Sequence, residues 1–449
     1  MTQRANFLRM TFSFFLLVTP LAQAQDYVLT DLGLGDTSPA INDSGTVTGT
    51  TSTQAWKWQS GVRTYLGSLG GGTSFSTSLN AKGTIVGYSY NGNYLDAFVY
   101  SSDGVLTDLG RLPGGNTSAA MGVNDFGAIV GYSYTGDSDN FLFHSVLWSD
   151  GTISDLGTLA GANSEAHDVN NAGVIVGTSD NVAFEYTTSS GMQSLGTLPG
   201  AAASVAFAIN STGVVVGFSE VPGPNSRVHA VRWDAGTITD LGVLAASVPS
   251  EISEALDINS AGVIVGDSTI EGEVVHAFVY DANRGMQDLN LLVNTPAGWT
   301  LTTATAINDL GQIVGLASVQ GQTHVFLLSP TAVPTSTPQI SISVSSQQVN
   351  EGAEATFTIS ASSINPAPIR VSYSMSGHAT DGQDYLLSGP VGEVIVPAGK
   401  SSATIVLRAL LDNVPEKRQT VKMKLKRGAG YKLSTTKTAA ITIVDTTSP

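Results

Sequence analysis

The stretch Val123-Asn-Asp-Phe-Gly-Ala-Ile-Val-Gly131 decides the fold, because close variants of it recur along the chain. Each copy has an asparagine with a glycine three residues later, and most copies end in an aliphatic pair and a second glycine. The asparagines are Asn42, Asn80, Asn124, Asn170, Asn210, Asn259 and Asn308. Their mean spacing is about 44 residues, which is in the range of β-propeller blades.

Each repeat predicts four short strands. The first ends at the asparagine, and the Asn-x-x-Gly step predicts a turn, because asparagine tolerates left-handed backbone angles and glycine favours them. The second strand is the β-branched Gly-x-Ile-Val-Gly segment. Segments such as His276–Tyr280 predict the third strand, and the fourth ends in Asp-Leu-Gly, as in Asp108–Gly110. The chain is therefore expected to be all-β.

The order of these strands predicts a closed ring. The seventh repeat lacks its Asp-Leu-Gly strand, whereas Tyr27-Val-Leu-Thr-Asp-Leu-Gly33 supplies one before the first asparagine turn. In a ring, this first strand completes the last repeat and shelters two sheet edges. We therefore predict a seven-bladed β-propeller over residues 25–329, closed by the N-terminal strand. An open β-solenoid is the alternative.

The repeats resemble an extracellular family named for its His-Ala-Phe motif, the HAF repeat, which stands here as His276-Ala277-Phe278. The resemblance covers about residues 27–329. It includes the stretch from Met286-Gln-Asp-Leu-Asn290 through Gly298-Trp-Thr to Ala306-Ile-Asn308. The resemblance implies a secreted protein and brings no ligand or activity with it.

The N-terminus predicts export. Arg4 and Arg9 precede a short apolar run, and Ala22-Gln-Ala24 provides a small-residue cleavage site, so residues 1–24 are expected to be a signal peptide of bacterial type. A retained anchor helix is the alternative, but the run is short for a membrane span. We expect no membrane span after signal removal. The chain has no cysteine, which excludes disulfides and thiolate metal sites.

Charge and composition change near residue 330. Residues 1–329 carry 9 basic and 28 acidic side chains, whereas residues 330–449 carry 11 and 8. Residues 330–338 are rich in Pro, Ser and Thr and predict a linker. Residues 339–449 contain about seven alternating runs, which predict an antiparallel β-sandwich. The net charge of −16 makes nucleic acid a poor partner.

The C-terminal domain resembles the Calx-beta module through Glu351-Gly352, Gly382-Gln-Asp-Tyr385, Pro397-Ala-Gly399 and the closing Ile443-Val-Asp445. The resemblance implies a calcium site built from loop carboxylates, because calcium takes six to eight oxygen ligands. The implied ligands are Glu351, Asp384, Asp412, Glu416 and Asp445. The site has fewer acids than the family pattern, with Lys417 and Gln419 nearby. A sandwich that has lost its metal is therefore the alternative.

Repeated polar residues predict scaffolding. Four histidines occupy one repeat position, and we expect each to make a hydrogen bond inside its repeat: His144, His229, His276 and His324. The Asp of Asp-Leu-Gly and the turn asparagine are expected to satisfy backbone groups. Asp43, Asp125 and Asp309 follow the turn asparagine and predict turn chemistry. His167 and His378 have no motif around them.

No catalytic or cofactor-binding motif is present, so we do not expect an enzyme. The predicted function is a secreted extracellular binding, adhesion or scaffold protein whose partner is an unknown glycan or protein. The alternative is a secreted polysaccharide-acting enzyme, a glycosidase or lyase, that uses the propeller channel. Its candidates are Glu251, Glu254, Glu271 and Glu273. An unrepeated cluster of carboxylates and aromatic residues in one pocket would favour the enzyme.

Overall fold

The structure is a computed structural model that describes residues 27–445 except 36, 137–141, 224–226, 246–250, 273, 332–337, 364–367, 398–399, 412–416 and 429. The expected signal peptide, residues 1–24, lies outside the described residues. No described helix is long and apolar enough to cross a membrane.

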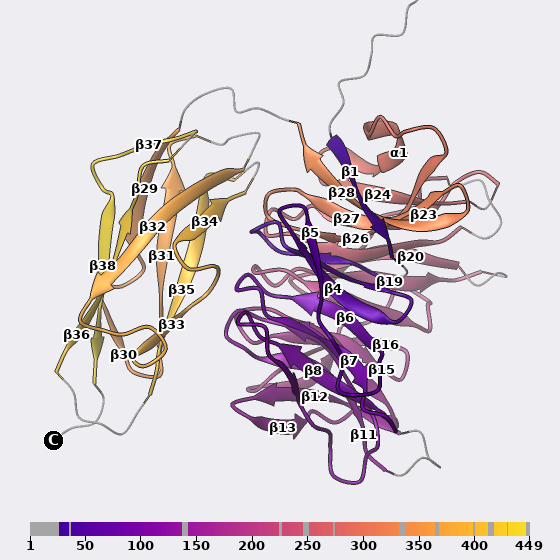
Figure 1. Cartoon of the computed structure of the whole chain (residues 1–449), viewed down its shortest axis with the longest axis horizontal. Coiled ribbons are helices and arrows are strands. Elements are labelled where there is room, and N and C mark those ends of the chain that lie inside the picture. Colours follow the sequence, from indigo (N-terminus) through magenta and orange to yellow (C-terminus); the bar gives the residue numbers. More distant parts are fainter. Residues whose placement is uncertain are drawn as a thin grey trace, which may run out of the picture.

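Residues 27–330 form seven antiparallel sheets of four strands each, one for every repeat (Figure 1). The first sheets are β2 (Ala40–Ile41), β3 (Val47–Thr51), β4 (Gln54–Gln59), β5 (Val62–Tyr65); β6 (Ser74–Leu79), β7 (Ile85–Tyr90), β8 (Leu95–Tyr100), β9 (Leu106–Asp108); and β10 (Ser118–Val123), β11 (Ile129–Tyr134), β12 (Phe143–Ser149), β13 (Thr152–Asp155). The next are β14 (Ser164–Val169), β15 (Ile175–Ser179), β16 (Val182–Thr187), β17 (Gly191–Ser194); and β18 (Ser204–Ile209), β19 (Val215–Val221), β20 (Arg227–Asp234), β21 (Thr237–Asp240).

The last of the remaining two sheets contains β1 (Tyr27–Leu34), the N-terminal strand, which pairs with the seventh repeat. The two sheets are β22 (Ser253–Ile258), β23 (Ile264–Thr269), β24 (Val275–Asp281), β25 (Gly285–Asp288); and β26 (Trp299–Ile307), β27 (Ile313–Val319), β28 (Gln322–Pro330), β1. β1 pairs antiparallel with β28, with Tyr27 opposite Pro330 and Leu34 opposite His324. The predicted contribution of the N-terminal strand to the last repeat is therefore confirmed.

Two details differ from the sequence-based expectation. β28 continues to Pro330, one residue into the predicted linker. A short helix, α1 (Leu289–Leu292), follows β25, and the side chain of Asp288 caps it by accepting from the backbone N–H of Asn290. No helix was predicted in this stretch.

The hydrophobic core of these sheets lies between neighbouring repeats. One cluster joins Val86 and Ala97 of the second sheet to Ala120, Val123 and Ile129 of the third. The pattern continues around the seven sheets, since each of the other clusters also draws on neighbouring repeats. A single four-stranded repeat cannot bury its apolar faces alone, so the repeats stabilise one another.

In six of the seven sheets, the first strand contains a bulge, and this bulge determines which residues line the candidate site. In β10, the pairing with β11 skips one residue between Ala120 and Gly122, so that Met121 has no partner across the strands. The same shift occurs in β6, β14, β18, β22 and β26. A bulge bends its strand and redirects the side chain of the extra residue.

The second glycine of the repeat faces this bulge. A Cβ atom added to Gly131 would lie 2.0 Å from the carbonyl oxygen of Ala119, and one added to Gly177 would lie 2.0 Å from that of Glu165. No side chain fits at such a distance. The glycine of Ile-Val-Gly is therefore required by the close approach of the bulged strand.

Two five-stranded sheets make up the C-terminal domain. One contains β33 (Tyr385–Leu387), β35 (Ser402–Ala409), β31 (Glu354–Ala361), β29 (Gln339–Val344) and β37 (Lys432–Leu433). The other contains β30 (Gln348–Asn350), β38 (Thr438–Val444), β36 (Gln419–Leu425), β32 (Ile369–Gly377) and β34 (Glu393–Val396). Both sheets contribute to one core around Phe357, Tyr373, Leu407 and Met423.

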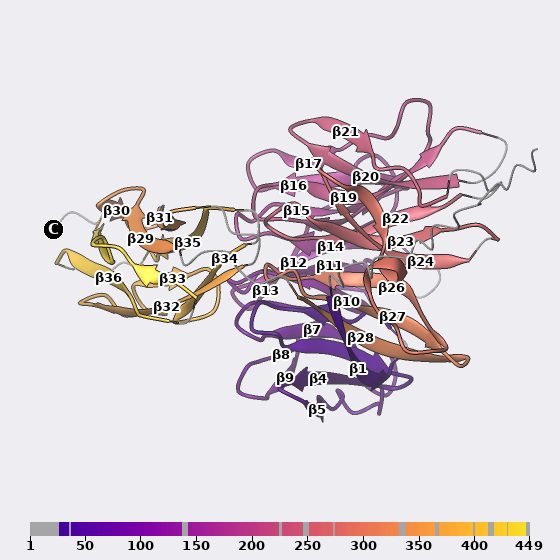
Figure 2. The same cartoon turned by 90° about the horizontal axis from the view of Figure 1, so that it is seen from above.

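The predicted sandwich is antiparallel except at two edges. β29 pairs parallel with β37, and β30 pairs parallel with β38. β30 and β37 are only two or three residues long, too short for their alternation to be read from the sequence. Figures 1 and 2 show these two sheets beside one side of the seven repeats.

Candidate functional site

The repeated asparagine does two structural jobs. Its Oδ1 accepts hydrogen bonds from the backbone N–H groups two and four residues later, for example from Phe126 and Ala128 to Asn124, both at 3.0 Å. Its Nδ2 donates to the backbone oxygen of the asparagine in the next repeat, at 3.1 Å from Asn124 to Asn170. The first bonds hold the turn, and the second joins the repeats.

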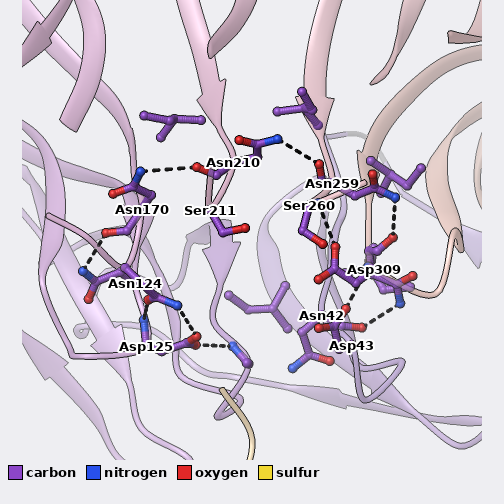
Figure 3. Close-up of a pocket in the computed structure, with 18 of the residues that line it drawn as sticks. Asn42, Asp43, Asn124, Asp125, Asn170, Asn210, Ser211, Asn259, Ser260 and Asp309 are labelled. Carbon is purple, nitrogen blue, oxygen red and sulfur yellow. Dashed lines mark hydrogen bonds between the residues drawn. The ribbon is translucent and has the colours of Figure 1, made fainter. Parts of the chain in front are cut away.

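These inter-repeat bonds form a closed cycle (Figure 3). All seven asparagines donate in the same direction, and Asn308 donates to the oxygen of Asn42 at 3.0 Å across 266 residues of sequence. The cycle surrounds a cavity of about 230 Å³, which is also lined by the aliphatic residue before each asparagine. The described repeats are thus linked end to end.

The acids beside this cavity bridge repeats rather than close their own turns, which corrects the expected turn chemistry. Asp43 accepts from the N–H of Asp309 at 2.9 Å, Asp125 from that of Ala81 at 2.9 Å, and Asp309 from that of Ser260 at 2.8 Å. Burial, reinforced by the charge of Asp309, raises the pKa of Asp43 to about 7.

The C-terminal domain contacts the rim of this cavity. Arg370 donates to the backbone oxygen of Asp43 at 2.9 Å, and the N–H of Gly389 donates to Asp125 at 3.0 Å. The guanidinium of Arg408 lies 4.4 Å from the ring centre of Phe126. The asparagine turns of the seven sheets are therefore on the side that faces the second domain.

A larger pocket, of about 380 Å³, lies toward the beginning of the first strands and is the candidate functional site. We call it the channel pocket. It is lined by Thr37, Ser38, Phe75, Ser76, Thr77, Tyr88, Met121, His167, Phe207, Leu256 and Thr305. Six of these are the extra residues of the six bulges: Thr77, Met121, His167, Phe207, Leu256 and Thr305. The bulge thus directs one variable side chain per repeat into the pocket.

Aromatic rings gather around this pocket. Phe75 and Tyr88 stack at 5.1 Å between ring centres, and Phe207 lies 5.6 Å from the His167 ring and 5.7 Å from that of Phe218. These flat apolar surfaces stand beside the hydroxyl groups of threonine and serine. Such a mixture is typical of pockets that bind small organic ligands.

His167 lines the pocket and contacts Glu165, which lies next to it outside the pocket lining. The Nε2 of His167 lies 3.8 Å from the carboxylate of Glu165, and its Nδ1 lies 2.7 Å from the backbone oxygen of Ala206, to which it can only donate. Burial opposes protonation of His167, but the contact with Glu165 outweighs it and raises the pKa. Burial and the charge of Glu165 raise the pKa of Tyr132 to about 12 and also raise that of Tyr88.

A second pair of acids lies on the next strands. Glu254 on β22 is directly opposite Asp267 on β23, at the repeat position that Phe75 and Tyr88 occupy in the second sheet. Burial raises the pKa of Glu254, and burial with the charge of Glu254 raises the pKa of Asp267 to about 7, although a hydrogen bond from Thr303 opposes this shift. Such a pair can hold one proton near neutral pH.

The repeated histidines hold the outer strands, as predicted. Each Nδ1 meets the aspartate of the outermost strand in its own sheet, at 2.9 Å for His144 with Asp155 and 2.7 Å for His276 with Asp288. His229 and His324 do the same with Asp240 and Asp31. Most of these aspartates also accept from the N–H of the following glycine. Histidine and aspartate are therefore partners in one structural pair.

The predicted enzyme candidates are scattered. Glu254 occupies the repeat position of Phe75 but is not part of the pocket lining, whereas Glu251 is buried in an ion pair with Arg227. Glu271 is exposed in a turn, and Glu273 lies outside the described residues. Reasoning from the sequence missed His167, which has no motif around it but lines the pocket.

Of the five implied calcium ligands, the structure brings three together. Glu351, Asp384 and Asp445 line a small cavity of about 10 Å³ that Lys417 and Gln419 also line. Gln419 donates to Asp384 at 3.2 Å. Asp412 and Glu416 lie outside the described residues.

The described residues do not fit a calcium site as they stand. A lysine and an amide donor occupy the space where a cation needs oxygen ligands. Within the described part of the chain, no group of three or more acidic or histidine side chains is arranged to hold a metal ion.

The residues of the channel pocket carry one signal that could have identified them. The position three residues before each turn asparagine differs in every repeat except for the two threonines, while the position before it is always serine or alanine. In a repetitive scaffold, a position whose residue type changes from repeat to repeat does not have the structural role that keeps the other positions constant. The sequence does not show on which side of the sheet these side chains lie, because the bulge interrupts the alternation of side chains along the strand.

No protein-family model matches the chain, and no curated protein matches it. Similar solved structures include CBD12 from CALX1.2, with a TM-score of 0.21 and 19% identity over 24% of this chain and 45% of that one. The apo-form Calx CBD1 domain has a TM-score of 0.20 and 21% identity over 24% of this chain and 97% of that domain. The extracellular domain of a hybrid two-component system from B. thetaiotaomicron has a TM-score of 0.41 and 7% identity over 92% and 57%. The chain thus spans about half the length of the first and third of these structures.

Proposed function

We propose that this chain is a secreted glycan-binding protein in which a seven-bladed β-propeller binds its ligand in the channel pocket. The observation that carries the proposal is the set of variable side chains that the bulges of six repeats direct into one pocket. Export by the predicted signal peptide would deliver the protein to the extracellular space, where glycans are abundant.

The pocket suits a sugar in shape and chemistry. Its volume of about 380 Å³ is within the range of small-molecule sites. The apolar face of a sugar ring can pack on Phe75, Tyr88 or Phe207, while its hydroxyls bond to Thr77, Thr305 and the nearby carboxyl groups. Aromatic side chains with an adjacent polar partner supply both needs at once.

The propeller interpretation rests on three connections. Seven sheets of four strands follow one another, the first strand of the chain pairs with the last repeat, and the asparagine bonds return from Asn308 to Asn42. A solenoid would leave its two ends apart. For the C-terminal domain we propose a Calx-beta-like module that acts as a spacer against the asparagine end of the ring.

Glycan-array binding by the full mature chain tests the proposal. The Phe207→Ala variant should lose most of the signal that the wild type gives, because it removes an aromatic wall of the pocket. Tyr65→Ala is the matched control, since Tyr65 lies on the outer strand β5 with 53% of its surface exposed. Equal binding by wild type and Phe207→Ala would place the ligand elsewhere and overturn the proposal.

One observation supports the enzyme as a second candidate. Glu254 and Asp267 lie opposite each other on β22 and β23, outside the lining of the channel pocket, and such a pair supports a glycoside hydrolase, because these enzymes work with two carboxyl groups, one of them protonated. Incubating the bound glycan with the protein and looking for shorter products decides between the two. Release of product that Asp267→Asn abolishes would establish the hydrolase, whereas an unchanged glycan leaves the binding protein.

A further inference from the structure

We infer that the channel pocket selects uncharged glycans and excludes those that carry carboxylate or sulfate groups. The inference rests on the proposed function and names the ligand class for the same pocket. It is carried by the carboxylates on the strands that hold the pocket residues and by the kinds of side chain that line the pocket.

The fixed charges around the pocket are acidic. Glu165 contacts His167 in the wall, and its charge is close enough to raise the pKa of both Tyr88 and Tyr132. Glu254 and Asp267 add a second acidic position on the neighbouring strands β22 and β23. An anionic sugar entering the pocket would therefore approach carboxylates from two sheets.

Nothing in the wall supplies a matching positive charge. The described residues that line the pocket include no lysine or arginine, and their one basic side chain is His167. His167 already contacts the carboxylate of Glu165 at 3.8 Å, so this side chain is engaged within the protein and is not available to pair with an acidic ligand. Recognition of carboxylate or sulfate groups in proteins ordinarily uses arginine or lysine.

Long-range electrostatic repulsion of acidic ligands acts in the same direction. Residues 1–329 carry 28 acidic and 9 basic side chains. A protein surface of one sign slows the approach of ligands of that sign. An uncharged sugar meets neither obstacle, because its hydroxyl groups can both donate to ionised carboxylates and accept from protonated ones.

This selection also narrows the alternative activity. Eliminative cleavage of polysaccharides removes the proton next to a uronate carboxylate, so its substrates are acidic. A pocket that excludes uronates would leave hydrolysis of neutral glycans as the remaining enzymatic candidate.

The test compares matched ligands on the full mature chain. Isothermal titration calorimetry measures the affinity of neutral glucan, mannan and galactan oligosaccharides and of uronate oligosaccharides with the same linkages. We expect each uronate to bind at least about tenfold more weakly than its neutral counterpart, since like charges in an interface oppose binding strongly. A uronate that binds as tightly as its neutral counterpart overturns the inference and leaves the proposed function in place.

Two variants locate the charge effect. Glu165→Gln should narrow the ratio of neutral to uronate affinity at least about threefold, because it removes one repelling carboxylate. Glu185→Gln is the matched control: Glu185 lies on β16 of the same sheet, outside the pocket lining, and the ratio should stay unchanged. An unchanged ratio in Glu165→Gln also contradicts the inference. Failure of every oligosaccharide to bind contradicts the proposed function itself.

Discussion

At the scale of single residues, the turn asparagine explains why one side chain persists through seven otherwise variable repeats. Its amide satisfies two backbone donors of its own turn and one backbone acceptor of the next repeat. The asparagines are 4–8% exposed. A buried polar group left without its partner destabilises the fold by more than the bond itself contributes. No other side chain offers both an acceptor and a donor with this geometry.

We therefore expect Asn124→Ala to lower the free energy of unfolding by about 2–4 kcal/mol, because three buried backbone groups lose their partners. Unfolding in guanidinium chloride measures the change. Asn93→Ala is the control, since Asn93 is an exposed loop residue and should change stability by less than about 0.5 kcal/mol. A similar small change in Asn124→Ala would show that the asparagine cycle is dispensable.

Asp267 predicts a dependence of stability on pH. Burial and the charge of Glu254 raise the pKa of this carboxyl to about 7. The folded state thus holds a proton that the unfolded state has released, and unfolding becomes easier as pH rises from about 4 to above 7. Asp267→Asn should flatten the fall in melting temperature between pH 5 and pH 8. An unchanged slope in the variant would show that Asp267 is ionised in the folded protein at neutral pH.

Asp240 provides the control of opposite sign. Burial opposes its ionisation, but the hydrogen bonds from His229 and Gly242 outweigh burial and lower its pKa. Its contribution to stability is therefore present above the unfolded pKa near 3.8 and is lost as pH falls through the folded value. Asp240→Asn should lower the melting temperature at pH 7 and leave it almost unchanged at strongly acidic pH.

At the scale of the elements, the sequence predicts the strands and turns that recur in every repeat, but not the bulges, the helix and the edge strands that depart from the repeat. The asparagine turns, the four strands of each unit and the N-terminal strand that joins the last sheet all follow from residue types at fixed spacing. The bulge does not, because Met121 and its equivalents share no residue type. The helix α1 and the parallel edges β30 and β37 are too short to leave a periodic pattern.

The residues of the candidate site could not be predicted from the sequence, because they lie at these bulges. Glu254 drew attention through an unusually long repeat, but His167 and Phe207 occur in repeats of ordinary length. Only the bulge, together with the glycine that accommodates it, shows that these side chains share one pocket. The predicted calcium ligands depended instead on a resemblance, and three of them do lie around one cavity.

The strand β1 gives the prediction that belongs to this scale. Deleting Tyr27–Gly33 removes the pairing with β28 and the buried side chains of Tyr27 and Leu32. It also exposes the edge of the last sheet. We expect a loss of at least about 3 kcal/mol in the free energy of unfolding, or a chain that does not fold, as circular dichroism during heating will show.

The control for β1 removes one side-chain contact and keeps the strand. His324→Ala breaks the bond to Asp31, a pair that is partly exposed to solvent, and should lower stability by less than about 1 kcal/mol. If the deletion is no more harmful than this substitution, the N-terminal strand does not close the ring.

At the scale of the whole molecule, the two domains differ in what stabilises them. The cavity shared by Glu351, Asp384 and Asp445 also contains Lys417 and Gln419. We expect about 1 mM calcium to shift the melting temperature of the wild type by less than about 1 °C, because the described lining of the cavity places a lysine and a glutamine amide beside its three carboxylates. The double variant Lys417→Ala, Gln419→Asp should gain at least about 3 °C from the same calcium. A clear stabilisation of the wild type by calcium would restore the implied site.

The last prediction concerns how the domains are held together. Arg408 lies against the ring of Phe126, and Arg370 and Gly389 bond to the rim of the asparagine cavity. An arginine over an aromatic ring contributes about 0.5–2 kcal/mol, so Phe126→Ala should loosen the contact without unfolding either domain. Small-angle X-ray scattering should then report a larger radius of gyration. Tyr94→Ala removes a comparable contact, that of Arg111 with an aromatic ring within the repeats, and should leave the radius unchanged. If Phe126→Ala also leaves it unchanged, the bonds at Asp43 and Asp125 suffice to hold the second domain against the ring.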